Sequence, residues 1–339
     1  MSNVVAVELW LGVTLYAVLG GADFGAGFWD LVAGGAKRGA APRALIDRAI
    51  TPVWEANHVW LIFVLVVLWT GFPDAFAAIG STLFVPLALA ALGIVLRGAG
   101  FAFRHVAGPL GIRRVLGAAF ALSSVLTPLF MGTVVGAIAS GRVPANGSGD
   151  RLTSWCNGTS LLVGALFVAT CAYVAATFLI ADARRAGDSG QERYFTRRAI
   201  GAALVTGGLA AAGLVGLHED ARYIYDGLTS DALALVIVSA VCGAGALAVL
   251  LRWDGAWARP FAVGAVVAIV WGWGVAQHPY LLPTSLTIDA GAAPHATLVA
   301  LVIVLAVAVV VIGPALALLF TLDRRSLLDE QAPSGRIAR

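Results

Sequence analysis

The sequence has 339 residues, of which 60% are hydrophobic and 12% are charged, and its formal net charge is +3 at pH 7. A water-soluble domain of this length could not hide so much apolar surface in one core, so the composition excludes the usual soluble enzymes and binding domains. The basic residues lie in alternate loops and not in one patch, which argues against nucleic acid as a partner.

About nine apolar runs, separated by short polar connections, are long enough to cross a hydrocarbon core of about 30 Å as helices. We therefore expect an all-α polytopic membrane protein with a single transmembrane domain over residues 1–322 and a polar cytoplasmic tail over 323–339. From the helix count alone, two four-helix bundles plus one peripheral helix are the expected arrangement. The expected spans are 4–33, 52–71, 75–103, 115–139, 159–182, 199–217, 232–251, 259–278 and 297–321.

The distribution of basic residues predicts the orientation. They follow the first, third, fifth, seventh and ninth expected spans, and cytoplasmic loops are the ones that carry such an excess. The N-terminus is therefore expected outside and the C-terminus in the cytoplasm. The first span has no basic leader and no cleavage site, so we expect it to be retained as an anchor. The residues that set this orientation include Lys37, Arg38, Arg43, Arg48, Arg104, Arg113, Arg114, Arg184, Arg185, Arg193, Arg197, Arg198, Arg252, Arg259, Arg324 and Arg325.

Four ionisable residues are expected at one depth near the cytoplasmic face. Glu55 and His58 are three residues apart at the start of the second span and so occupy neighbouring positions on one helical face. Asp23 and Arg97 lie near the cytoplasmic ends of the first and third spans. Because a charge inside the membrane costs on the order of 2.5–3.5 kcal/mol, such residues usually mark a proton or ion path. We therefore expect one buried polar cluster with a cytoplasmic opening.

A structural interpretation competes with this one. Arg97 could simply neutralise Asp23 or Glu55, with His58, Trp54 and Trp60 acting as anchors at the membrane interface. The chain has only five histidines, mostly near helix ends, two methionines and three cysteines. Haem needs axial ligands such as His or Met, so we expect no haem, no metal and no disulfide in this chain. Catalysis by the chain alone is not expected, because phosphate-binding and hydrolase motifs are absent.

Four motifs in order along the chain resemble subunit II of the cytochrome bd-type quinol oxidases, which reduce oxygen to water. The first is Gly-Ala-Asp-Phe-Gly-Ala-Gly at 21–27, and the second is Pro-Val-Trp-Glu-Ala-Asn-His-Val-Trp at 52–60. The third is Arg-Gly-Ala-Gly-Phe-Ala-Phe-Arg at 97–104. The last is Pro-Tyr-Leu-Leu-Pro at 279–283, followed by Ser-Leu-Thr at 285–287. One departure is Ala56, where the family often has glycine.

The resemblance implies a partner and a set of cofactors. Subunit I of the family holds the quinol site, two b-type haems (b558 and b595) and one d-type haem, and a chain like this one is its pseudo-symmetric partner in a heterodimer. The complex lies in the bacterial cytoplasmic membrane, uses quinol and O2 as substrates and generates a proton gradient. Small single-helix accessory subunits, and a structural quinone or lipid, are further candidates for binding. Ubiquinol and menaquinol are not distinguished.

The resemblance also implies a role for one acid. The acid at the position of Glu55 belongs to a channel that carries cytoplasmic protons toward the oxygen-reducing haem of subunit I. Our hypothesis is that protons enter past Asp23 and His58 and are relayed by Glu55, while Arg97 and Asn57 hold the geometry. Two alternatives are a proton-coupled secondary transporter, which would need polar groups at mid-membrane depth, and a purely structural subunit that moves no protons.

Overall fold

The computed structural model describes the chain except for residues 36, 51–53, 105–109, 253–254, 256 and 325–339, and most of the expected tail lies outside the described residues. Several side chains within its helices, including those of Trp54, Glu55 and Asn57, are also outside the description. Within the described part the fold is all-α apart from one small hairpin, which confirms the expected class. The elements are α1 (Ser2–Leu15), the π-helix η1 (Tyr16–Gly20), α2 (Gly21–Val32), α3 (Ala40–Ile50), α4 (Trp54–Gly71), α5 (Pro73–Thr82), α6 (Phe84–Arg104), α7 (Leu110–Ala139), α8 (Gly158–Arg185), α9 (Ser189–Asp220), α10 (Arg222–Thr229), α11 (Leu233–Leu251), α12 (Ala258–Gln277), β1 (Tyr280–Leu282), β2 (Leu286–Thr287) and α13 (His295–Arg324).

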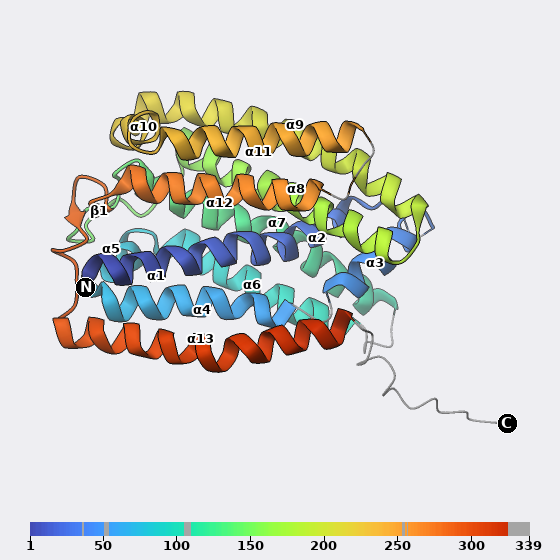
Figure 1. Cartoon of the computed structure of the whole chain (residues 1–339), viewed down its shortest axis with the longest axis horizontal. Coiled ribbons are helices and arrows are strands. Elements are labelled where there is room, and N and C mark those ends of the chain that lie inside the picture. Colours follow the sequence, from blue (N-terminus) through green and yellow to red (C-terminus); the bar gives the residue numbers. More distant parts are fainter. Residues whose placement is uncertain (36, 51–53, 105–109, 253–254, 256, 325–339) are drawn as a thin grey trace.

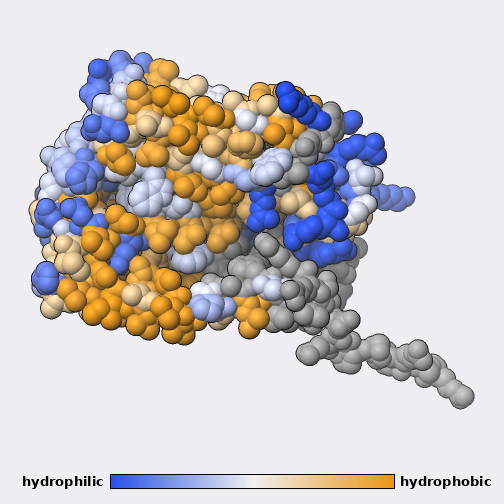
Figure 2. Space-filling view, viewed as in Figure 1, coloured by the Kyte–Doolittle hydropathy of each residue, from blue (hydrophilic) through white to orange (hydrophobic). Residues whose placement is uncertain are grey.

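The long helices run side by side, and the short elements lie at the two ends of the bundle (Figure 1). The N-terminus, α10 and β1 are at one end, and α3 is at the other. On the face shown in Figure 2, the surface is largely apolar over the middle of the bundle and hydrophilic at both ends, as expected for a membrane-spanning protein. Among the described residues, seven helices are long and apolar enough to cross a membrane, or eight when the bent pair α4 and α5 counts as one span. Nine spans and two four-helix bundles remain predictions.

The expected span 75–103 is wrong in one respect, because it consists of two helices. Phe72 leaves the helical conformation, as the residue before a proline tends to do, and Pro73 then starts α5 at an angle of 116° to α4. A second break at Leu83 separates α5 from α6. Phe72 and Leu83 are both fully buried, so the breaks are fixed by packing.

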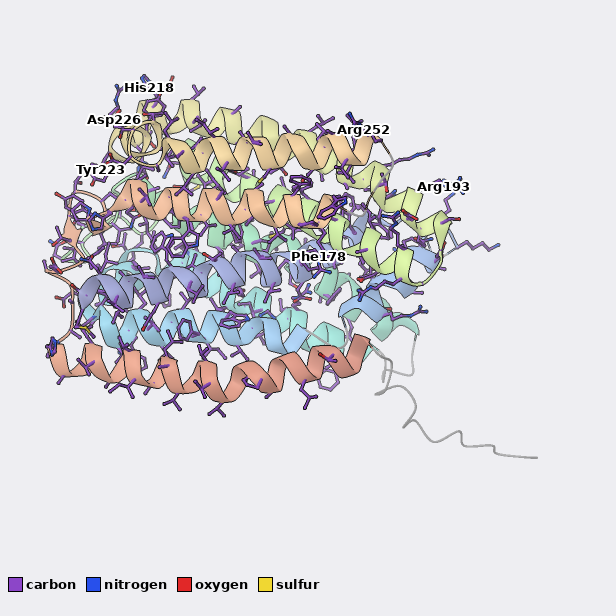
Figure 3. The ribbon with its side chains drawn as sticks, viewed as in Figure 1. Phe178, Arg193, His218, Tyr223, Asp226 and Arg252 are labelled. Atoms are coloured by element: carbon purple, nitrogen blue, oxygen red, sulfur yellow. The ribbon has the colours of Figure 1, made fainter. Side chains whose placement is uncertain are left out.

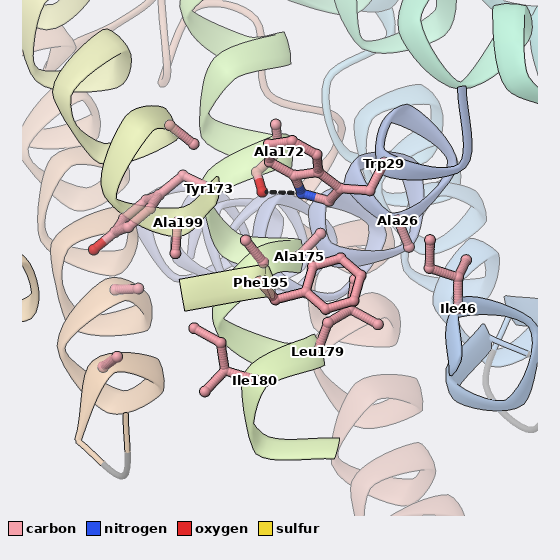
Figure 4. Close-up of a cluster of buried hydrophobic side chains, with 14 of the residues drawn as sticks. Ala26, Trp29, Ile46, Ala172, Tyr173, Ala175, Leu179, Ile180, Phe195 and Ala199 are labelled. Atoms are coloured by element: carbon pink, nitrogen blue, oxygen red, sulfur yellow. Dashed lines mark hydrogen bonds between the residues drawn. The ribbon is translucent and has the colours of Figure 1, made fainter. Parts of the chain in front are cut away.

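The largest cluster of buried side chains surrounds α8, which packs against α2, α3, α7, α9 and α12. In Figure 4 the indole of Trp29 on α2 points at α8, where its Nε1 donates a hydrogen bond of 2.8 Å to the carbonyl of Ala172. Contact between α2 and α8 is close because Gly25 has no side chain: a Cβ at this position would run into the backbone carbonyl of Cys171. This packing fixes the position of α2, which carries Asp23.

The first span is not a uniform α-helix. The π-helical turn η1 separates α1 from α2 and ends three residues before Asp23. π-helical turns are rare and are frequently found at functional sites. The extra residue rotates the inner half of the span relative to its outer half, so it contributes to the direction in which Asp23 faces.

Candidate functional site

The structure brings Asp23 and Arg97 together as a buried ion pair. Arg97 on α6 is 2% exposed, and its Nη2 donates to Asp23 Oδ1 at 2.6 Å and to the Asp23 carbonyl at 2.9 Å. The other terminal nitrogen, Nη1, donates to Ser124 Oγ on α7. The guanidinium therefore connects three helices, α2, α6 and α7.

Aromatic rings complete the surroundings of the guanidinium. Its central carbon lies 5.1 Å from the ring centroid of Phe24 and 4.6 Å from that of Phe120. Arginine over an aromatic face is a favourable cation–π arrangement, and it is stronger where water is excluded. Ser124 Oγ in turn donates to the Phe120 carbonyl at 2.6 Å. The position of Arg97 is thus set by charge, hydrogen bonds and ring contacts at once.

His58 on α4 lies beside this pair. The imidazole is half-buried, and its ring centroid is 5.9 Å from that of Phe24, the residue after Asp23. Trp60, also half-buried, packs against the buried cluster of Tyr16, Phe24 and Cys171. Two of the expected residues on α4 therefore face the same region as the ion pair.

The remaining expected residues belong to the first turn of α4. Trp54, Glu55 and Asn57 lie in the helix, but their side chains are outside the described part of the structure. Glu55 precedes His58 by three residues, about 4.5 Å along the helix axis, toward the end of the molecule that contains α3. Their placement in the cluster stays a prediction.

A family model described as "Cytochrome bd terminal oxidase subunit II" matches residues 1–322, which include every part of this site. The chain belongs to the cytochrome bd terminal oxidase subunit II family. This confirms the resemblance found in the motifs. Members of the family are subunits of a haem-containing quinol oxidase complex in the bacterial membrane, so the chain is a subunit of an oxidoreductase complex.

Relatives of known sequence or structure agree with the family assignment. A provisionally assigned cytochrome bd menaquinol oxidase subunit II from Bacillus subtilis (strain 168) is 23% identical over 95% of this chain and 96% of its own length. The cytochrome bd-I ubiquinol oxidase subunit 2 of Escherichia coli (strain K12) is 30% identical over 41% of this chain and 36% of its own length. The solved structure of bd oxidase from Geobacillus thermodenitrificans contains a chain that superposes with a TM-score of 0.76, at 26% identity and with coverage of 95% and 98% of the two chains.

Several residues around Arg97 were not predicted from the sequence. Ser124 and Phe120 were not expected, although Ser123, Ser124 and Thr127 are polar residues close together in the largely apolar stretch 115–132 of α7 and could have indicated a contact. Gly27 is the last residue of the first motif. A Cβ at Gly27 would run into Ser124 and Arg97, so this glycine leaves room for the ion pair itself.

One atom of the pair has no hydrogen-bond partner among the described residues. Arg97 occupies Asp23 Oδ1, whereas the other carboxylate oxygen, Oδ2, is buried without a partner. A carboxylate oxygen can accept a proton or a hydrogen bond. The site therefore combines a fixed guanidinium with an acceptor oxygen close to His58.

Proposed function

We propose that this chain is the haem-free subunit of a bd-type quinol oxidase, that it stabilises the haem-bearing subunit I, and that it supplies a proton path from the cytoplasm. The whole complex oxidises quinol, reduces O2 to water and generates a proton gradient. In this proposal Glu55 is the group that passes protons on toward subunit I.

The observation that carries the proposal is the buried pair of Asp23 and Arg97 beside His58. Three helices of an otherwise apolar bundle place charged or titratable groups together at one depth, where each is costly in a membrane. A pair buried for stability alone is often no better than apolar residues of the same size. The additional titratable groups on α4 favour a role in moving protons.

The residues act in different ways in this mechanism. Arg97 is a positioning residue, since its hydrogen bonds hold Asp23 and Ser124 in place. Asp23 Oδ2 is the acceptor that faces incoming protons, and His58 and Glu55 on α4 take up and pass on the proton. Asn57, Trp54 and Trp60 support the first turns of α4.

The proposal assigns haem b558, haem b595 and haem d to the partner subunit. A haem in this chain would need axial ligands from its bundle. Met131, the single methionine beyond Met1, has its Sδ 3.8 Å from the Tyr16 hydroxyl within a packed aromatic cluster. This arrangement does not fit an axial ligand, so no step of the mechanism in this chain passes through haem.

One observation favours the competing view of a purely structural subunit. Arg97 has acceptors at both terminal nitrogens and rings on two sides, as a residue that only locks helices together would have. That view predicts that the acid at Glu55 can be replaced without effect on turnover. The two views therefore differ in a single measurable outcome.

The experiment measures quinol-driven oxygen consumption by the purified complex at matched haem content. Glu55→Gln removes the titratable group and keeps the size, and we expect turnover to fall by about tenfold or more with haem absorbance retained. Glu55→Asp should recover part of the activity. The matched control is Glu192→Gln, an acid at the α3 end of the bundle that pairs with Arg184 at 3.0 Å, and it should leave turnover unchanged. Full turnover in Glu55→Gln would reject the proton path.

A further inference from the structure

A cavity of about 200 Å³ opens on the surface where α9 meets α10, at the end of the bundle opposite α3. Leu214 and Val215 form its apolar wall, and His218 and Tyr225 form its polar side. Figure 3 shows His218, Tyr223 and Asp226 together at this end of the molecule, with Arg193 and Arg252 at the other. This cavity has no role in the oxidase function proposed above.

Arg222 contacts the two polar residues that line the cavity, His218 and Tyr225, and we call these three residues the polar rim. Its Nη1 donates to His218 Nε2 at 2.6 Å, its Nε lies 3.1 Å from Asp226 Oδ1, and its guanidinium carbon is 5.6 Å from the ring centroid of Tyr225. The side chain is 61% exposed, so its ion pair contributes little stability and exchanges readily for another anion. A guanidinium has five N–H donors in a fork that matches phosphate oxygens.

The short helix that carries Arg222 is firmly held. Ile224 and Leu228 on α10 are buried in a cluster with residues of α12, and the Tyr223 hydroxyl donates to the His278 carbonyl at 3.0 Å. Arg222 and Asp226 are on the exposed side of the same helix. The packing of α10 therefore fixes the positions of Arg222, Tyr225 and Asp226 at the cavity.

The depth of this rim matches the headgroup layer of a bilayer. From Ala199, just after the basic start of α9, to His218 is about 29 Å along a helix, close to the hydrocarbon thickness of about 30 Å. Val215 is 61% exposed, and Leu204 and Val205 further along α9 are exposed as well. A Cβ at Gly207 or Gly208 would meet open space. An acyl chain can therefore lie along α9 directly below the polar rim.

We propose that this cavity binds one phospholipid with an amine-bearing headgroup, such as phosphatidylethanolamine. The phosphate lies against Arg222 and His218, the ammonium group is near the exposed acids Glu219 and Asp226, and one acyl chain follows Val215 and the glycines of α9. The two acids disfavour a purely anionic headgroup. The structure thus fits a headgroup that carries both charges.

The test uses the purified, delipidated complex and native mass spectrometry with added phosphatidylethanolamine, phosphatidylglycerol or inorganic phosphate. We expect one phosphatidylethanolamine to bind the wild-type complex, and Arg222→Gln to weaken it by about tenfold through loss of the forked contact. Val215→Trp, which fills the acyl path and leaves the rim intact, should also weaken it. Arg151→Gln, an exposed arginine of the loop before α8, is the control and should bind as the wild type does.

Three results would overturn the proposal. Equal retention of phosphatidylethanolamine by wild type and Arg222→Gln would show that the rim recognises no headgroup. Stronger binding of phosphatidylglycerol would contradict the role of the acids, and binding of inorganic phosphate with no lipid would identify a free anion site. Oxygen consumption by Arg222→Gln should stay at the wild-type value, so the outcome is independent of the proton path.

Discussion

Two arginine–aspartate pairs in this chain have similar nitrogen–oxygen distances and very different surroundings. The Arg97–Asp23 pair has a nitrogen–oxygen distance of 2.6 Å and side chains 2% and 1% exposed. The Arg142–Asp220 pair, which joins the loop after α7 to the end of α9, has two hydrogen bonds of 2.7 Å and side chains 30% and 33% exposed. Since desolvation makes a broken buried pair costly and water screens an exposed one, distance alone does not tell what a pair contributes.

The largest expected effect comes from breaking the inner pair. Arg97→Ala leaves Asp23 buried without its counter-charge, which we expect to destabilise the subunit by about 3–5 kcal/mol. The measurement is the yield of assembled complex and the temperature at which haem absorbance is lost. The double variant Asp23→Asn/Arg97→Gln removes both charges and should recover much of the loss. Equal behaviour of the single and double variants would argue against a charge effect.

A smaller effect is expected from the third member of the inner site. Ser124→Ala removes one hydrogen bond to a charged group and should cost about 1.5–3 kcal/mol. Ser123→Ala is a suitable control, because among the described residues the Ser123 hydroxyl bonds only within its own helix, to the Phe120 carbonyl at 3.0 Å. The measurement is the thermal stability of the purified complex with each of the two serine variants. If Ser123→Ala is as damaging as Ser124→Ala, the contact with Arg97 is not the cause.

The packing that carries Asp23 can be tested with two glycines one turn apart. Gly25→Ala places a methyl group against the backbone of Cys171, and overpacking of this kind typically costs about 1–3 kcal/mol. Gly21→Ala should be tolerated, because its Cβ would be 3.6 Å from Cys171 Sγ, an ordinary contact. The measurement is the yield of assembled complex for Gly25→Ala and for Gly21→Ala. Loss of the complex in both variants would mean that helix flexibility, and not close approach, requires these glycines.

The smallest effect is expected from the outer pair. Asp220→Asn should change stability by about 0–1 kcal/mol, and the difference from wild type should shrink further as salt is added. The thermal midpoint of the complex, recorded at low and at high ionic strength, measures the change in stability and its dependence on salt. A loss as large as that of Arg97→Ala would remove the contrast between the two pairs.

The sequence was sufficient to predict that Asp23 and Arg97 lie at one depth, because both are near the ends of apolar runs that cross in the same direction. It could not predict their contact, which depends on how α2, α6 and α7 pack. Ser124 and Phe120 were not predicted for the same reason. The sequence pattern around a serine or phenylalanine in an apolar helix does not indicate which residue of another helix it contacts.

The helix boundaries show where pattern reading fails. The run 75–103 is largely apolar, so hydropathy does not register the break at Leu83, whereas the turn at Phe72 falls between the expected spans 52–71 and 75–103. The signals were local ones, Pro73 at the start of α5 and Pro86 in the first turn of α6, where proline is tolerated. The amphipathic helices α3 and α10 were likewise missed, because they are too short for a membrane span.

The central claim, that this subunit conducts protons through Glu55, is tested most directly by proton uptake. A pH-sensitive dye on the cytoplasmic side of the membrane-embedded complex would record uptake when the fully reduced enzyme reacts with O2. We predict that Glu55→Gln slows this uptake by about tenfold or more while haem absorbance and quinol binding are retained. Proton uptake at the wild-type rate in Glu55→Gln would contradict the account and leave the subunit with a structural role.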